Sequence, residues 1–141
     1  MQLRVGLPCC GLDAVGEGIE IIRNEYDIDV RIERACDLIR NLMQTLESHG
    51  IRPACIRVGP EGDLLAIGFN TRADVELIIS GPPCPPWSAL GLKFGEGDAR
   101  ALVFDRVLEL IHNQHRRGTL KAFIIENVVA VDHVAKHDDA G

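Results

Sequence analysis

A cysteine held between prolines is the first candidate for chemistry in this chain. Cys84 stands in the run GPPCPPWS at residues 81–88, with Pro83 before it and Pro85 after it. Proline fixes its own φ angle and drives the preceding residue toward extended backbone, so this turn holds Cys84 in one pose. A thiol presented in this way suits nucleophilic attack, because a thiolate is a strong nucleophile. The alternative is a small buried cysteine at the end of a strand.

A polar pair follows an apolar run further along the chain. Glu126 and Asn127 come directly after AFII at residues 122–125, a run typical of a central strand. In open α/β sheets, ligands bind just beyond the carboxyl ends of the strands. Since Cys84 also follows an apolar strand, Cys84 and Glu126 are expected to face one crevice. The alternative for the polar pair is an ordinary cap or turn.

These two stretches resemble the motifs of one enzyme family. Residues 81–88 are similar to the Pro-Cys loop of the cytosine-C5 DNA methyltransferases, and residues 126–128 are similar to the family's Glu-Asn-Val motif. The resemblance implies that Cys84 adds covalently to C6 of a cytosine ring. It also implies that Glu126 holds the N3 edge and favours its protonated form, while Asn127 steadies the loop around the nucleophile.

The implied reaction explains why a thiol and an acid are needed. C5 of cytosine is a poor nucleophile until addition at C6 turns the ring into an enamine. A free thiol with a pKa of about 8.5 is only slightly ionised at pH 7, and a nearby helix N-terminus raises its thiolate fraction. An acid at N3 offsets the electron density that enters the ring, which is stabilisation of developing charge.

The resemblance further implies S-adenosylmethionine as the cofactor, held at the ends of the first three strands of a Rossmann-like sheet. Gly11 follows the first expected strand, where a glycine lets backbone approach a ligand closely. The family pattern there is similar to Phe-x-Gly-x-Gly-Gly, whereas this chain has CCGLDA at residues 9–14. Gly11 and Leu12 are therefore assigned to the cofactor loop, and Pro83 of the cysteine loop is assigned to the same pocket.

An acid at the end of the second strand is implied to accept hydrogen bonds from the ribose hydroxyls. Asp37 fits this role if the strand reaches Cys36, and Glu33 fits it if a helix begins earlier. We prefer Asp37. The alternative for either residue is a solvated carboxylate on a helix face.

Two later segments complete the implied cofactor site. Residues 62–64 (GDL) resemble the family's Gly-Asp-Ile element, which touches the adenine amino group, so Asp63 and Leu64 are assigned to the cofactor. Asp63 is otherwise a plain turn acid. Leu102 lies where the family places an adenine-packing residue, and its alternative is ordinary core.

Strands alternate with helices along the chain, which predicts an α/β fold with a mostly parallel sheet covered on both faces. The second strand has two readings: it ends at Val30 and a helix runs over 32–49, or it extends through Cys36. The resemblance implies a Rossmann-like S-adenosylmethionine-dependent methyltransferase fold that is incomplete on its C-terminal side. The expected strands are 3–7, 26–30, 54–58, 74–80 and 122–125, and the other expected helices are 14–23 and 105–115, the latter closed by Gly118.

Composition limits the classes that remain. The 141 residues are 46% hydrophobic with a formal charge of −6, which favours one catalytic core over 1–131 and a polar tail over 132–141. The longest apolar runs are far shorter than a membrane span, so no membrane partner is expected. Five cysteines without paired zinc spacing favour a reducing intracellular compartment, nuclear in a eukaryote or cytoplasmic in a prokaryote, and no metal.

We therefore expect a DNA (cytosine-5-)-methyltransferase that binds DNA weakly, because the chain is acidic and lacks a clear basic stripe. We also expect little or no turnover without a missing C-terminal half or a partner subunit. Two alternatives stay open: a tRNA cytosine-5 methyltransferase, which shares the core motifs, and a non-catalytic methyltransferase-like binding or regulatory module.

Overall fold

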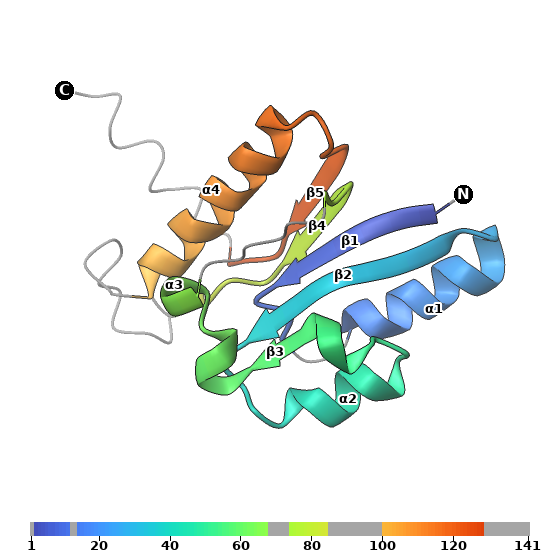
Figure 1. Cartoon of the computed structure of the whole chain (residues 1–141), viewed down its shortest axis with the longest axis horizontal. Coiled ribbons are helices and arrows are strands. Elements are labelled where there is room, and N and C mark those ends of the chain that lie inside the picture. Colours follow the sequence, from blue (N-terminus) through green and yellow to red (C-terminus); the bar gives the residue numbers. More distant parts are fainter. Residues whose placement is uncertain (1, 12–13, 68–73, 85–99, 129–141) are drawn as a thin grey trace.

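The computed structural model describes residues 2–11, 14–67, 74–84 and 100–128. In these residues, five strands form one sheet in the order β3-β2-β1-β4-β5, and every pairing is parallel (Figure 1). The elements are β1 (Gln2–Pro8), α1 (Ala14–Tyr26), β2 (Asp29–Asp37), α2 (Leu42–Ser48), η1 (Pro53–Cys55), β3 (Ile56–Val58), η2 (Gly59–Gly62), α3 (Leu64–Ile67), β4 (Leu77–Ser80), α4 (Ala101–Arg116) and β5 (Ala122–Ile125).

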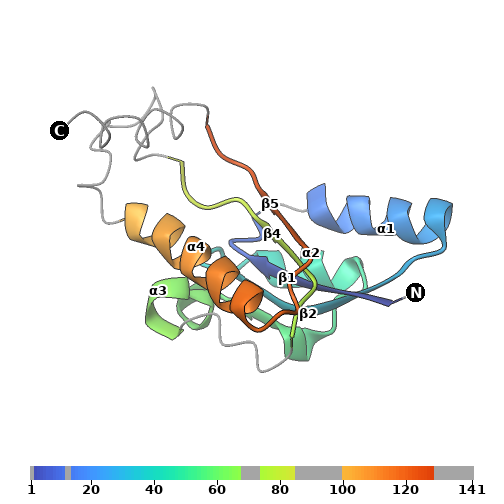
Figure 2. The same ribbon diagram turned by 90° about the horizontal axis from the view of Figure 1, so that it is seen from above.

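The sheet is covered by helices on both faces, as Figure 2 shows for α1 and α4. Successive side chains of a strand point to opposite faces, so neighbouring residues Ala35 and Cys36 of β2 enter different cores. One core joins β1 and β2 to α1 and α2, with Ile19 and Leu46 as buried helix residues. The other core joins β4 to α3 and α4. This arrangement is the Rossmann-like methyltransferase fold that the sequence predicted.

The second strand follows the longer of its two readings. β2 runs from Asp29 to Asp37 and pairs with β1 along its length, from Gln2 opposite Asp29 to Pro8 opposite Cys36. The helix that an apolar stripe suggested over 32–49 is wrong for its first part, since α2 covers only residues 42–48. Tertiary pairing overrides the helical spacing here, because pairing with β1 and β3 holds residues 29–37 in an extended strand.

A register shift interrupts the pairing of β1 and β2. Val5 lies opposite Ile32, whereas Gly6 lies opposite Arg34, so Glu33 is an extra residue on β2. The bulge bends the strand and changes which face each following residue meets. Its consequence is that Asp37 ends β2 beside the end of β1.

The starts of three strands are joined by one carboxylate. Glu76 accepts hydrogen bonds from the Lys121 ammonium at 2.6 Å and from the Arg4 backbone N–H at 3.1 Å. The bond to Lys121 contributes most, followed by the bond to Arg4, and together they hold the pKa of Glu76 below its usual range. Glu76 therefore links the beginnings of β1, β4 and β5.

β5 differs from the central strand that its sequence indicated. It pairs with β4 from Ala122 opposite Leu77 to Ile125 opposite Ser80, and lies at the edge of the sheet in the described residues. Phe123 and Ile124 are each 55% exposed. The expectation of a central position was wrong for this part of the chain, because an apolar run alone does not say how many neighbours a strand has.

The last helix agrees with its expected end and begins earlier than expected. α4 starts at Ala101, and Gly118 follows it with a φ of +75° while its N–H bonds to the His115 carbonyl. A left-handed glycine is the usual way to end a helix. No helix among the described residues has the length and apolar character needed to cross a membrane. The expected tail over 132–141 lies outside the described residues.

Candidate active site

A cavity of about 250 Å³ opens at the carboxyl edge of the sheet. Its lining combines the turn after β1 with the ends of β4 and β5, and in the chain these segments are far apart. This is the edge where ligands bind in open parallel sheets. The residues that bear on its chemistry are Cys9, Cys10, Gly11, Ser80, Gly81 and Glu126.

The turn after β1 is fixed by bonds to its neighbour β4. The buried Ser80 hydroxyl donates to the Pro8 carbonyl at 2.6 Å, and the Gly81 N–H donates to the Cys9 carbonyl at 3.2 Å. Cys9 has a φ of +52° and Gly11 a φ of +54°, both in the left-handed region. A methyl group on Gly11 would meet nothing within 4 Å, so its backbone faces open space. The turn therefore exposes main chain at the edge of the cavity.

Asp37 closes this turn from the side of β2. Its Oδ2 accepts a hydrogen bond from the Gly11 N–H at 2.9 Å, and its Oδ1 accepts one from the Ile39 N–H at 3.0 Å. The rival candidate Glu33 lies inside β2 at the bulge, and its carboxylate pairs with Arg31 at 2.9 Å. Of the two acids, Asp37 is the one at a strand end next to Gly11.

The Gly-Asp-Leu segment lies next to Asp37. Gly62 is buried, and a β-carbon there would lie 2.2 Å from the Asp37 carbonyl oxygen. Asp63 follows η2, and its Oδ1 accepts a hydrogen bond from the Leu65 N–H at 2.9 Å. Leu64 is only 3% exposed and belongs to the core under α4. The structure thus brings Asp63 near the strand ends and turns Leu64 into the interior.

Leu102 lies in the first turn of α4 and is 55% exposed. The alternative that it is ordinary core is therefore wrong. Leu12 lies outside the described residues, as do residues 85–88 of the cysteine loop.

The two candidate catalytic motifs are held together by two hydrogen bonds, one between backbone groups and one from a side chain. The Glu126 N–H donates to the Ser80 carbonyl at 2.9 Å, and the Asn127 side-chain amide donates to the Pro82 carbonyl at 3.2 Å. Glu126 reaches back over the cavity, since a β-carbon on Gly81 would lie 3.4 Å from its Oε2. Cys84 follows this joined segment as a free, half-buried thiol.

Comparison with known proteins agrees with this arrangement. The family described as C-5 cytosine-specific DNA methylase matches residues 36–139, well over half of the chain. The chain belongs to this family. The match includes both motifs of the site, Cys84 in its proline loop and Glu126 after β5.

Individual methylases are also similar to this chain. The Type II methyltransferase M.SacI of Streptomyces achromogenes is 27% identical over 127 residues, covering 84% of this chain and 31% of that protein. The Type II methyltransferase M.SsoII of Shigella sonnei is 33% identical over 69 residues, or 49% of this chain and 17% of that protein. M1.ScrFI of Lactococcus lactis subsp. cremoris is 32% identical over the same share of each chain. The chain spans less than a third of the length of these relatives.

The candidate site contains two cysteines that were not assigned to it from the sequence. Cys9 and Cys10 line the cavity, and burial raises the pKa of each to about 12, with the nearby Cys36 and Asp37 adding to the effect. Burial likewise raises the pKa of Cys36 to about 11. These thiols stay protonated near neutral pH, so they do not act as nucleophiles there. Their position directly after the first strand was the signal that could have found them.

Ser80 is a further residue beside the cavity that the sequence did not single out. It is 2% exposed and its hydroxyl joins the ends of β4 and β1. A serine at the last position of an apolar strand signals such a bond, because a buried hydroxyl needs a partner. Among the described side chains, no group of three or more His, Cys, Asp or Glu is arranged to hold a metal ion.

Proposed function

We propose that this chain carries the cofactor pocket and the nucleophile of a DNA (cytosine-5-)-methyltransferase. One observation supports this proposal most: the Asn127 amide bonds to the Pro82 carbonyl, two residues before Cys84, while the adjacent Glu126 lines a cavity. A thiol loop and an acid are thus attached to each other beside a space for ligands. Membership in the C-5 cytosine-specific DNA methylase family supports the same reaction.

The residues at the carboxyl edge fit S-adenosylmethionine. Gly11 leaves backbone open toward the cavity, and Asp37 at the end of β2 keeps acceptor capacity, because a carboxylate has about four acceptor sites and two are used here. In the proposal, Gly11 lies against the cofactor, Asp37 accepts from its ribose hydroxyls, and Asp63 approaches the adenine. When bound, S-adenosylmethionine supplies the methyl group that C5 receives.

Each motif residue has a defined task in the proposed reaction. The Cys84 thiolate attacks C6 of cytosine and forms a carbon–sulfur bond, which makes C5 nucleophilic. Glu126 donates a hydrogen bond to N3 and so stabilises the charge that the ring gains. After methylation, loss of the C5 proton to a base expels the Cys84 thiolate and restores the aromatic ring.

Asn127 is a positioning residue in this scheme. Its amide nitrogen donates to Pro82, and its Oδ1 accepts from the Val128 N–H at 2.8 Å. Both ends of the side-chain amide are therefore engaged, so its orientation is fixed. Loss of this amide would loosen the Cys84 loop without removing either reacting group.

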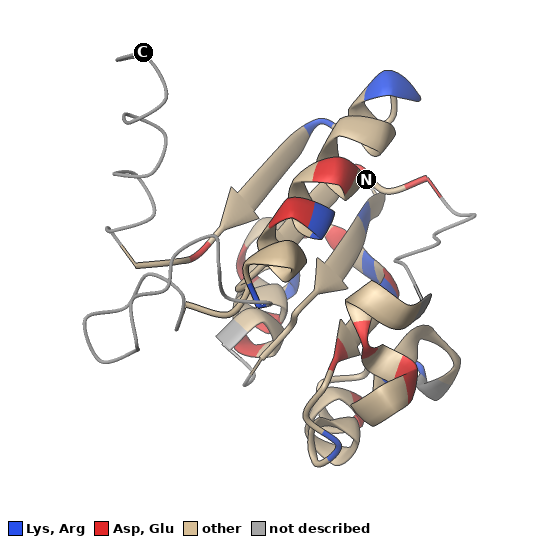
Figure 3. Cartoon of the chain, turned by 90° about the vertical axis from the view of Figure 1, so that its left-hand side faces the viewer, with Lys and Arg blue, Asp and Glu red and all other residues tan. Residues whose placement is uncertain are grey.

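DNA is the proposed substrate, with weak affinity for this chain alone. Acidic and basic residues are interspersed along the ribbon in Figure 3, and the described residues in this view form no continuous basic stripe. With a formal charge of −6, the chain has little of the cationic surface that usually grips phosphates. We infer that additional polypeptide supplies most of the contacts to the DNA phosphates.

Trapping of the covalent intermediate tests the proposal. The chain, together with the remaining two thirds of M.SacI supplied as a separate polypeptide, is incubated with S-adenosylmethionine and duplex DNA that contains 5-fluorocytosine. The fluorine at C5 blocks release, so an adduct on the peptide that contains Cys84 is expected by mass spectrometry. Cys84→Ser should abolish the adduct, and Cys55→Ala, a substitution of a buried cysteine that does not line the cavity, should preserve it.

An absent adduct in protein that remains folded would overturn the enzyme proposal. Calorimetry with S-adenosylhomocysteine separates the remaining possibilities. Binding without an adduct would instead support the non-catalytic module, which the glycine-poor sequence CCGLDA at residues 9–14 favours. An RNA oligonucleotide that contains 5-fluorocytosine and traps Cys84 in place of DNA would support the tRNA enzyme.

A further inference from the structure

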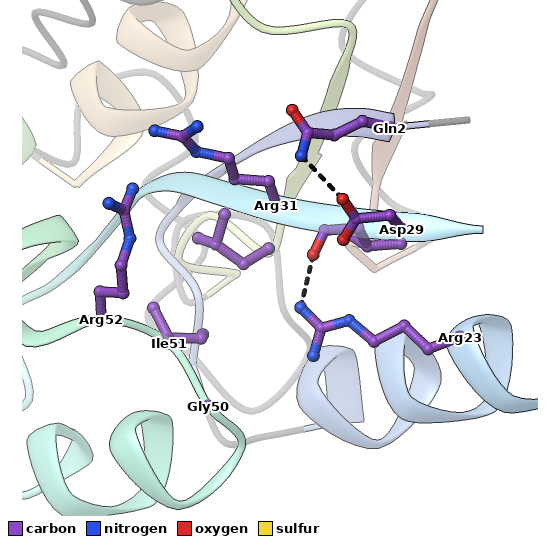
Figure 4. Close-up of a pocket in the computed structure, with 9 residues that line it drawn as sticks. Gln2, Arg23, Asp29, Arg31, Gly50, Ile51 and Arg52 are labelled. Atoms are coloured by element: carbon purple, nitrogen blue, oxygen red, sulfur yellow. Dashed lines mark hydrogen bonds between the residues drawn. The ribbon is translucent and has the colours of Figure 1, made fainter. Parts of the chain in front are cut away.

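A second cavity, of about 210 Å³, lies at the opposite edge of the sheet, where β1 and β2 begin (Figure 4). Arg23 at the end of α1, Arg31 of β2 and Arg52 in the segment after α2 line it, together with Gln2 and Asp29. It shares no lining residue with the cavity beside Glu126. The proposed methyltransferase chemistry therefore does not account for it.

The cavity gathers positive charge in an acidic chain. Three of its lining residues are arginines, while the whole chain has a formal charge of −6. The carboxylates nearby are engaged: Asp29 Oδ2 accepts from the Gln2 amide at 2.7 Å, and Glu33 pairs with Nε of Arg31 at 2.9 Å. The three arginines outnumber these two acids, so the charge around the cavity has a small positive excess.

The arginines differ in how much of their hydrogen-bonding capacity is used. Arg23 donates to the Val30 carbonyl and thereby fixes the end of α1 against β2. The bond of Arg31 to Glu33 uses only Nε, so its two terminal nitrogens stay available. Within the described part of the chain, the exposed Arg52 guanidinium has no hydrogen bond or ion pair. Two guanidinium groups thus have donors to spare.

These two groups reach the cavity from different elements. In Figure 4 Arg31 extends from β2 toward the left of the view, and Arg52 extends upward from the segment after α2, while both residues line the same cavity. Like charges that line one cavity repel each other, and an anion between them removes that repulsion. The planar fork of a guanidinium group matches the oxygen spacing of a phosphate, and two forks hold a tetrahedral group from two sides.

We propose that this cavity binds a small ligand with a terminal phosphate group. Arg31 and Arg52 hold the phosphate, Arg23 adds charge, and Asp29 with Gln2 offers partners to a hydroxyl on the rest of the ligand. A duplex backbone fits less well, because long polyanions need an extended basic surface and this site is a small cavity in an acidic chain.

The test is a titration of the full chain with inorganic phosphate and with dCMP, at ionic strength held constant with chloride. Arginine side-chain NMR signals report each guanidinium separately. Saturable shifts of Arg31 and Arg52 are expected, and Arg52→Gln should weaken the apparent affinity by about tenfold, the effect of losing one charge-assisted bond. The matched control Arg116→Gln removes the same charge from the far end of α4 and should leave the affinity unchanged.

Three results would overturn this site. Shifts that also appear with chloride alone would indicate general screening, and equal weakening by Arg116→Gln would indicate net charge only. Saturation by duplex DNA at a lower concentration of phosphate groups than dCMP requires would identify a DNA-backbone contact instead. Arg31→Gln provides an independent second variant, and the thermal unfolding midpoint shows that each variant remains folded.

Discussion

Gly62 is the position where a single methyl group has the clearest consequence. A β-carbon there would lie 2.2 Å from the Asp37 carbonyl oxygen and 2.4 Å from the Arg57 carbonyl oxygen. Both obstacles are backbone atoms at the ends of β2 and β3, so neither can rotate away. The two strand ends must separate by about 1 Å, and we expect Gly62→Ala to destabilise the fold by about 3 kcal/mol, the upper end of the usual cost of overpacking.

Urea unfolding of the 141-residue chain measures this loss by linear extrapolation. Gly18→Ala is the matched control: Gly18 lies inside α1, and a β-carbon there meets nothing within 4 Å. The same methyl group should therefore stabilise by about 0.5–1 kcal/mol, because alanine favours helix. A loss below about 0.5 kcal/mol for Gly62→Ala would refute the packing argument.

The same substitution also tests whether the packing at Gly62 supports the proposed cofactor site. A displaced Asp37 no longer meets the Gly11 N–H at 2.9 Å, so the turn after β1 loses its support. Under the proposed function, calorimetry should show weaker S-adenosylhomocysteine binding by Gly62→Ala at a temperature where the variant is still folded. Unchanged affinity would mean that the turn keeps its shape without Asp37.

Three further outcomes follow from buried or paired groups. Ser80→Ala leaves the Pro8 carbonyl without its 2.6 Å donor and should cost about 1–2 kcal/mol in urea unfolding, whereas no loss would mean that water replaces the hydroxyl. Folding lowers the pKa of Glu76 from its usual value of about 4.5, so its ion pairs stabilise the folded protein at pH values above 4.5. This stabilisation is lost as the pH falls through the folded pKa. The difference in unfolding free energy between wild type and Glu76→Gln should therefore close below pH 4.5. Cys10, with its pKa raised to about 12, should react with iodoacetamide at pH 8 at least about tenfold more slowly than a free cysteine, and equal rates by peptide mapping would contradict its burial.

The sequence was sufficient for the layered α/β fold and for the placement of Glu126 at a strand end. Alternating strands and helices, and acids directly after apolar runs, are local signals that survive folding. The length of β2 was harder, because residues 32–46 carry a helical spacing as well as a buried strand. Only pairing with β1, including the bulge at Glu33, decides between them.

The parts that the sequence did not predict depend on contacts between distant segments. The Ser80 bond to Pro8 and the closeness of Gly62 to Asp37 join residues that no periodicity relates. The exposed position of β5 is another example, since Phe123 would be buried if another strand or helix covered it. A sequence pattern indicates whether a residue favours a buried position. Whether the residue is in fact buried depends on the segments that pack around it in the fold.

The amide of Asn127 makes the thiol loop and the acid parts of one mechanical unit. Any motion that withdraws Pro82 from the sheet edge pulls on the residue next to Glu126, so both arms of the site travel together. Under the proposed function, a cytosine that enters the site would then meet either both groups or neither. Half-assembled states, in which the Cys84 thiol waits without Glu126, would thereby be disfavoured.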